Sequence, residues 1–170
     1  MIENLTRFTI LSRRSIRKYT SESINAEYIQ IMLEAAMAAP SASNRKPWHF
    51  IVIKNRKILD TLAKNLQYGK MLHEAPLCIA VCGDIALSEQ YWIQDCSAAT
   101  ENILLAATAL SLGSVWLGIY PNKDRVKIIT KLLKIPKNIV PLDLISIGHP
   151  AENKEARTQF DKIRVHLDEW

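Results

Sequence analysis

Three segments of the sequence contain residues of types that can bind a ligand. The first is the run Arg13-Arg14-Ser15-Ile16-Arg17. Its guanidinium groups and its serine hydroxyl can donate hydrogen bonds to phosphate oxygens. A solvated helix end has the same composition, so this run alone does not establish a phosphate site.

The second group is the segment Pro40–Trp48, whose small polar residues between two prolines predict a stiff loop rich in donors and acceptors. An ordinary turn between a helix and a strand fits it equally well. The third group is Trp116–Pro121. There Gly118 allows a ligand to approach the backbone closely, although Trp116 fits the core as well as a site.

No standard catalytic or nucleotide-binding motif accompanies these groups. The sequence contains no G-x-G-x-x-G, no G-x-x-x-x-G-K-[ST] and no G-x-S-x-G. Its histidines are isolated and lack metal-ligand spacing, so no metal is expected. If the protein is an enzyme, we therefore expect a bound cofactor to carry the reaction.

Apolar periodicity predicts the elements that position these groups. Helices are expected near 3–11, 59–66 and 126–133. Another is expected to begin after an N-cap at Asn25 and to carry Met37 on its apolar face. The longest is expected over about 90–112, with Gly113 ending it. Strands are expected at 48–53, 77–82, 114–119 and 142–147. This alternation indicates an α/β or α+β domain with a covered sheet.

Composition limits the class of protein. The 170 residues are 48% hydrophobic and 23% charged, which is typical of one soluble globular domain. The net charge of +5 comes from scattered lysines, which favours a phosphorylated cofactor over nucleic acid. The three cysteines form no C-x-x-C and predict no disulfide framework. With no signal peptide or membrane-length apolar stretch, we expect a cytoplasmic protein.

Taken in order, four segments resemble the nitroreductase family of flavoproteins, in its short compact branch. The similarity runs over nearly the whole chain. The segments are Arg13–Arg17, Pro40–Trp48, Asp95–Asn102 and Gly148-His149-Pro150. One position departs from the pattern, because Lys46 stands where the family commonly has glutamine.

The resemblance implies bound FMN and assigns contacts to it. Arg13 would meet the phosphate. Arg17 would lie at the N1–O2 edge of the flavin ring, where with Lys70 it would stabilise the charge of the reduced flavin. No residue is implied as acid, base or nucleophile. The full implied set is Arg13, Arg14, Ser15, Arg17, Pro40, Ser41, Ser43, Asn44, Gln67, Lys70, Leu117, Gly118, Lys162 and Arg164.

The resemblance also implies an α+β fold, with a mostly antiparallel central sheet covered by helices, in an intertwined homodimer. Residues 1–170 would form one FMN-binding domain, with 151–170 as a C-terminal extension on the partner subunit. The loop Pro40–Asn44 would reach the partner's flavin. NADH or NADPH would reduce flavin N5, and an acceptor such as a nitroaromatic or quinone would reoxidise it in a ping-pong mechanism.

Three alternatives stay open at this point. The first is another flavin enzyme on the same fold, of dehalogenase or flavin-fragmenting type. The second is a flavin- or nucleotide-binding protein without catalysis. The third is a basic module that binds nucleic acid, for which salt-sensitive DNA binding would be the signature.

Overall fold

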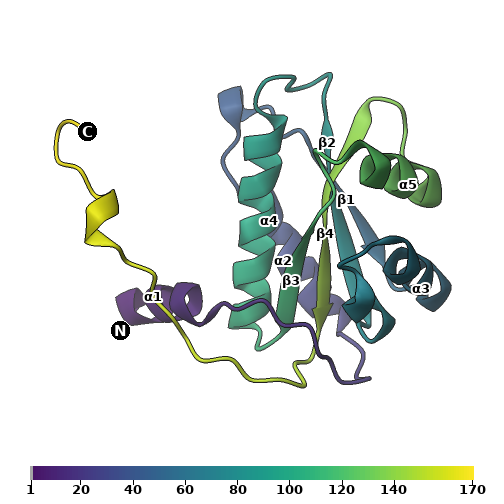
Figure 1. The fold of residues 1–170 in the computed structure, drawn as a ribbon, viewed down its shortest axis with the longest axis horizontal. Coiled ribbons are helices and arrows are strands. Elements are labelled where there is room, and N and C mark those ends of the chain that lie inside the picture. The colour runs from purple at the N-terminus through teal and green to yellow at the C-terminus, as the bar shows by residue number, and fades with distance from the viewer. Residues whose placement is uncertain (1) are drawn as a thin grey trace.

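A four-stranded sheet forms the centre of the protein, in a computed structural model that describes residues 2–170 (Figure 1). Its strands are β1 (Trp48–Ile53), β2 (Leu77–Asp84), β3 (Gly113–Gly118) and β4 (Ile139–Gly148), in the order β1-β2-β4-β3. Each pair of neighbours is antiparallel. The expected α+β class is confirmed, and this sheet is antiparallel throughout.

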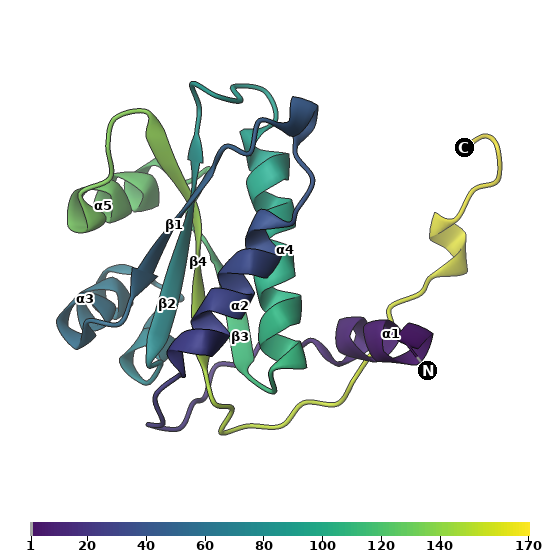
Figure 2. The ribbon, with the colours of Figure 1, turned by 180° about the vertical axis from the view of Figure 1, so that it is seen from behind.

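Helices cover both faces of the sheet (Figures 1 and 2). Helices α2 (Ala26–Met37) and α4 (Trp92–Ala109) pack on one face, while α3 (Arg56–Asn65) and α5 (Lys123–Leu133) pack on the other. A separate apolar cluster fills the space between the sheet and each layer. This double coverage explains why β2 is almost continuously apolar in the sequence.

Asparagine side chains fix the starts of three helices. Asn25 accepts a hydrogen bond of 3.0 Å from the Glu27 amide, which confirms the predicted cap of α2. Asn55 and Asn122 cap α3 and α5 in the same way. The beginnings of these helices are therefore set by local sequence.

Three expectations at element boundaries need correction. Helix α4 ends at Ala109 because Ser111 adopts a left-handed backbone conformation with φ of 60°; Gly113 is instead the first residue of β3. Met37 is 55% exposed, because it is the last residue of α2 and lies beside the buried stripe that includes Ala36. Strands β2 and β4 extend beyond the predicted 77–82 and 142–147, since their pairing continues there.

The N-terminal helix and the C-terminal tail lie outside the central layers. Helix α1 (Ile2–Ser12) leads into residues 13–20, and the start of the tail runs alongside them. Beyond Arg157 the tail, with the short helix η3 (Lys162–Arg164), extends clear of the body (Figures 1 and 2). Within residues 2–170, no helix has both the length and the apolar character needed to cross a membrane.

Candidate cofactor-binding site

A pocket of about 520 Å³ lies beside the edge strand β3, where α5 begins. The short helix η2 (Lys70–His73) and the residues before it form the opposite wall. Five residues of the predicted site line this pocket, namely Arg17, Gln67, Lys70, Leu117 and Gly118. The other lining residues are Leu66, Tyr68, Gly69, Met71, Trp116, Ile119 and Arg125.

Strand β3 presents the backbone edge that faces away from β4 to this pocket. The Ser114 carbonyl accepts a hydrogen bond of 3.0 Å from the Ile16 amide, on the side away from β4. Because backbone groups alternate along a strand, those of Gly118 also face outward. Nothing lies within 4 Å of the place where a Cβ of Gly118 would be. A flat ligand can therefore lie directly against this residue.

The pocket is cationic. Its lining includes Arg17, Lys70 and Arg125 and contains no Asp or Glu. The remaining surface is largely apolar, with Trp116 and Met71 among its walls. Such a pocket suits a ligand with a flat apolar ring and a negative charge at its edge.

Arg17 is held in place by the start of the tail. Its backbone amide donates a hydrogen bond of 2.6 Å to Glu152 Oε1, and Lys154 Nζ lies 3.3 Å from the same oxygen. The hydrogen bond from Arg17, followed by the effect of Lys154, holds the pKa of Glu152 below its usual value. Lys154 also donates to the Ser15 carbonyl over 2.6 Å. Sequence reasoning missed both Glu152 and Lys154.

The wall that carries Lys70 is attached to α3 by a polar cluster. The Arg56 guanidinium donates to the backbone carbonyls of Ala75, over 2.9 Å, and of Leu72. It also pairs with Asp60 at 3.0 Å, and His73 Nδ1 lies 3.1 Å from the same oxygen. The His73 hydrogen bond is the main reason that the pKa of Asp60 is lowered. These contacts fix η2 relative to α3.

The predicted phosphate-binding residues before Arg17 do not line the pocket within one chain. Arg13 Nε lies 3.6 Å from Glu101 Oε1 on α4. Arg14 donates to the Glu155 carbonyl, and Ser15 pairs with Ser114 as an extension of the sheet edge. This segment therefore runs beside the pocket while the side chains of Arg13 and Arg14 engage other parts of the chain.

The loop Pro40–Asn44 is also separate from the pocket and includes the short helix η1 (Ala42–Asn44) beside the start of α4 (Figure 2). The buried Asp95 carboxylate accepts a hydrogen bond of 2.9 Å from the Ala42 amide. Ser43 and Asn44 have left-handed backbones with φ of 52° and 54°. Asp95 thus anchors this loop to the first turn of α4.

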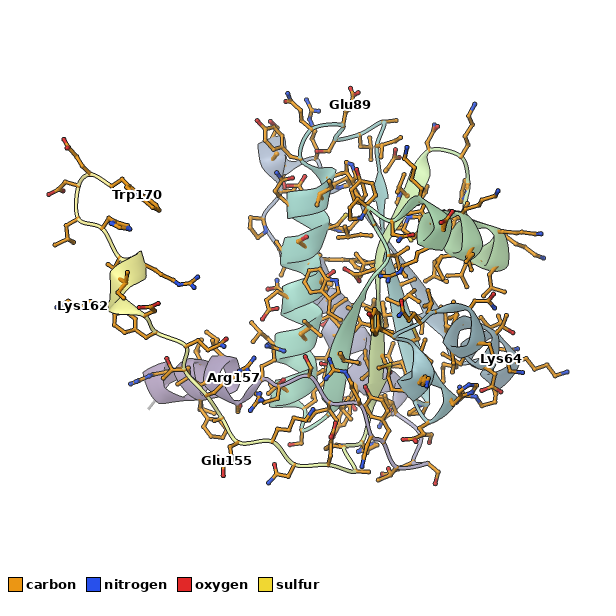
Figure 3. The ribbon with its side chains drawn as sticks, viewed as in Figure 1. Lys64, Glu89, Glu155, Arg157, Lys162 and Trp170 are labelled. Atoms are coloured by element: carbon orange, nitrogen blue, oxygen red, sulfur yellow. The ribbon has the colours of Figure 1, made fainter. Side chains whose placement is uncertain are left out.

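The C-terminal basic pair lies far from the pocket. Figure 3 shows Lys162 on the part of the tail that stands clear of the body, beyond α1. Arg164 pairs only with its neighbour Asp161, at 3.3 Å, among the described residues. One chain thus brings together five of the predicted residues, while the loop 40–44 and the pair 162–164 remain outside.

Arg125 is the main pocket residue that sequence reasoning missed. It lies in the first turn of α5, where its lysine-rich surroundings conceal it as one more surface charge. A signal was available, because positive charge in the first turn of a helix opposes the helix dipole. An arginine at such a position is a candidate for a role other than stability.

An antiparallel sheet covered on both faces, with a cationic pocket at its edge strand, places the protein among α+β proteins with a ligand-binding pocket. Comparison with known proteins identifies the family within this class. The model of the Nitroreductase family matches residues 10–69 and 61–149. A protein of Methanothermobacter thermautotrophicus, provisionally named NADH dehydrogenase/NAD(P)H nitroreductase, is 47% identical over 163 residues, covering 95% of this chain and 85% of its own.

Solved structures agree with this assignment. A similarly named Parabacteroides distasonis protein has a TM-score of 0.96 and 42% identity, covering 98% of this chain and 99% of its own. A nitroreductase of Desulfovibrio desulfuricans, solved in complex with FMN, has a TM-score of 0.81 and 33% identity, covering 95% and 96%. The chain belongs to the nitroreductase family, which confirms the resemblance inferred from its motifs.

Proposed function

We propose that the protein binds FMN in the pocket beside β3 and transfers electrons from NADH or NADPH to an oxidised acceptor such as a nitroaromatic or a quinone. One observation supports this most directly. Open space beside Gly118 adjoins a cationic lining without acids, and this combination suits a flat ring that gains negative charge. The names of the relatives and the FMN complex of the Desulfovibrio desulfuricans protein support the same cofactor.

The bound flavin would supply the capacity to accept a hydride and to pass electrons on. The chain supplies position and electrostatics. Arg17 and Lys70 bring positive charge to the lining of the pocket, where it would stabilise the reduced, negatively charged ring. The outward amide of Gly118 can donate a hydrogen bond to a ring nitrogen, and the apolar walls keep water from the ring face.

We further propose that the active form is a homodimer in which each flavin contacts both chains. Large apolar side chains of α1 and the tail are exposed, including Phe8 at 65% and Leu167 at 86%. A single chain leaves them in water, whereas a partner subunit would cover them. In the dimer, the loop 40–44 and the tail 151–170 would reach the partner and complete its site.

Anaerobic reduction of the purified protein tests this function. We expect a yellow protein that releases FMN on denaturation and whose flavin is bleached by NADH or NADPH and reoxidised by a nitroaromatic or quinone. Bound flavin that neither nicotinamide reduces would favour a carrier without catalysis. Halide release from a halogenated aromatic, without nitro or quinone reduction, would favour the dehalogenase alternative.

A further inference from the structure

Arg125 makes two specific contacts within the pocket. Its Nη1 donates a hydrogen bond of 3.0 Å to the Gly118 carbonyl. Its guanidinium carbon lies 5.8 Å from the centre of the Tyr68 ring, within the range of a cation–π contact. The guanidinium is thus held between Gly118, at the end of β3, and Tyr68, on the opposite wall. Gly118 is also the residue proposed to contact the flavin.

No carboxylate of the described residues forms an ion pair with Arg125. Its neighbour Asp124 does not, and no acidic residue lines the pocket. One guanidinium donor binds Gly118, and the group has five N–H donors in a planar fork. Such a fork matches the two oxygens of a carboxylate or phosphate. Arg125 therefore retains donors suited to an anionic oxygen group.

The surroundings of Arg125 reinforce this preference. Helix α5 begins at Lys123, so Arg125 lies at the positive end of the helix dipole. The segment 123–137 contains six basic residues and one acidic residue, a local charge of +5 that equals the net charge of the whole chain. The resulting positive potential attracts anions toward this side of the pocket.

The proposed flavin contacts leave Arg125 available. Arg17 and Lys70 are assigned to the charge of the reduced ring, and the Gly118 amide would contact the flavin while the Gly118 carbonyl accepts from Arg125. We infer that Arg125 binds a carboxylate or phosphate group of the ligand that exchanges electrons with the flavin, and so determines which ligands are preferred. This inference rests on the proposed function and extends it to the charge of the substrate.

Two pairs of ligands test the inference and identify the source of the anionic group. The acceptor pair is 4-nitrobenzoate and 4-nitrobenzamide, which have similar shapes and differ by one negative charge. The donor pair is NADH and dihydronicotinamide riboside, which carries the same ring without phosphate. For each pair, kcat/KM of the anionic member is divided by that of the neutral member, in the wild type and in Arg125→Gln.

We expect Arg125→Gln to lower this ratio about tenfold in one pair, the effect of losing a charge-assisted hydrogen bond at a half-exposed site. The pair whose ratio falls in Arg125→Gln shows whether the acceptor or the donor carries the anionic group that Arg125 binds. Arg125→Lys should keep most of the preference because it keeps the charge. Lys127→Gln, which removes a charge from the same helix outside the pocket, should leave both ratios unchanged. In the wild type, added KCl should lower the ratio of that same pair, because salt screens the attraction between Arg125 and the anionic ligand.

A purely structural role for Arg125, such as anchoring Gly118, would lower kcat/KM equally for both members of each pair. Equal losses, or no change in either ratio, would overturn the inference, and so would wild-type ratios that do not depend on salt. The proposed function is judged separately. If the protein binds no FMN, or if neither NADH nor NADPH reduces its bound FMN, both the proposed function and this inference are contradicted. If the flavin is reduced normally and the ratios do not change in Arg125→Gln, only the inference is contradicted.

Discussion

The hydroxyl of Thr100 on α4 donates a hydrogen bond of 2.9 Å to Oδ2 of Asp143 on β4, and both side chains are fully buried. The other carboxyl oxygen, Oδ1, has no hydrogen-bond partner among the described residues. Burial raises the pKa of Asp143 to about 8, although the Thr100 hydrogen bond acts in the opposite direction. Burial therefore favours the neutral, protonated form of Asp143 in the folded protein.

This pKa predicts a stability that falls as pH rises. The unfolded chain loses the Asp143 proton at about pH 3.9, whereas the folded chain keeps it until about pH 8. Between these values the folded state binds more protons, so the free energy of unfolding falls by up to about 1.4 kcal/mol per pH unit. In Asp143→Asn, which keeps a Thr100 acceptor, this contribution to the slope disappears.

Urea unfolding at pH 5 and pH 8, at fixed protein and FMN concentrations, measures the difference. Asp143→Asn should gain stability relative to the wild type as pH rises. The same pH dependence in both proteins would show that Asp143 is ionised in the fold.

Arg13→Ala should weaken FMN binding about tenfold to a hundredfold if Arg13 binds the phosphate, because a charge-assisted hydrogen bond contributes roughly 1.5–3 kcal/mol. Fluorescence titration of the apoprotein with FMN and riboflavin measures this loss. Riboflavin lacks the phosphate, so its affinity should not change.

Glu101→Gln is the matched control, because Glu101 is the partner of Arg13 in the ion pair at 3.6 Å. This variant frees the Arg13 guanidinium and should bind FMN at least as tightly as the wild type. Equal weakening of FMN and riboflavin in Arg13→Ala would assign Arg13 to the structure of the α1–α4 region instead.

The local parts of the fold were predictable from the sequence, because their signals lie within a few residues. The Asn25 cap and the apolar strand β1 were found where the pattern placed them. The end of α4 was not, because a serine at positive φ is uncommon and leaves no pattern. Gly113, two residues after Ser111, has the residue type that usually ends a helix, and it therefore misled the prediction.

The site was predictable only in part. The family resemblance supplied Arg17 and Lys70, which the structure brings into one pocket. Glu152, which binds the Arg17 amide from 135 residues away, leaves no local sequence signal. Arg125 was hidden for a different reason, since its pocket position depends on how α5 packs against β3. A single sequence does not encode such long-range contacts in its local pattern.

Arg17→Ala and Lys70→Ala should each lower the midpoint potential of the bound flavin, by on the order of tens of millivolts. Both side chains line the pocket, and a nearby cation favours the reduced, negatively charged flavin over the neutral oxidised form. Equilibration with a reference dye of known potential measures the change. Lys64→Ala, an exposed lysine of α3 outside the pocket, should leave the potential unchanged. If all three variants keep the wild-type potential, these two cations do not lie at the charged edge of the ring.

Two variants that each bind FMN weakly should restore each other's binding if the flavin site is shared between subunits. The loop 40–44 lies outside the pocket of its own chain, although it is held in a defined conformation by Asp95 and by the hydrogen bond of 3.0 Å from the Lys46 amide to Ser41 Oγ. A two-fold dimer would place this loop at the partner's pocket and build two equivalent sites. One variant is Arg13→Ala, and the other is the double change Ser41→Ala and Asn44→Ala.

Each variant carries a different affinity tag, and the mixed dimer is purified on both after the subunits have been dissociated and reassociated. In that dimer one pocket combines the unchanged Arg13 of one chain with the unchanged loop of the other. We expect tight FMN binding and NAD(P)H-driven turnover to return at this pocket alone, with about half the flavin content of the wild-type dimer. Both homodimers remain weak in the same assay and serve as controls. A verified mixed dimer without recovered flavin binding, or a wild-type monomer with full activity, would contradict the shared site.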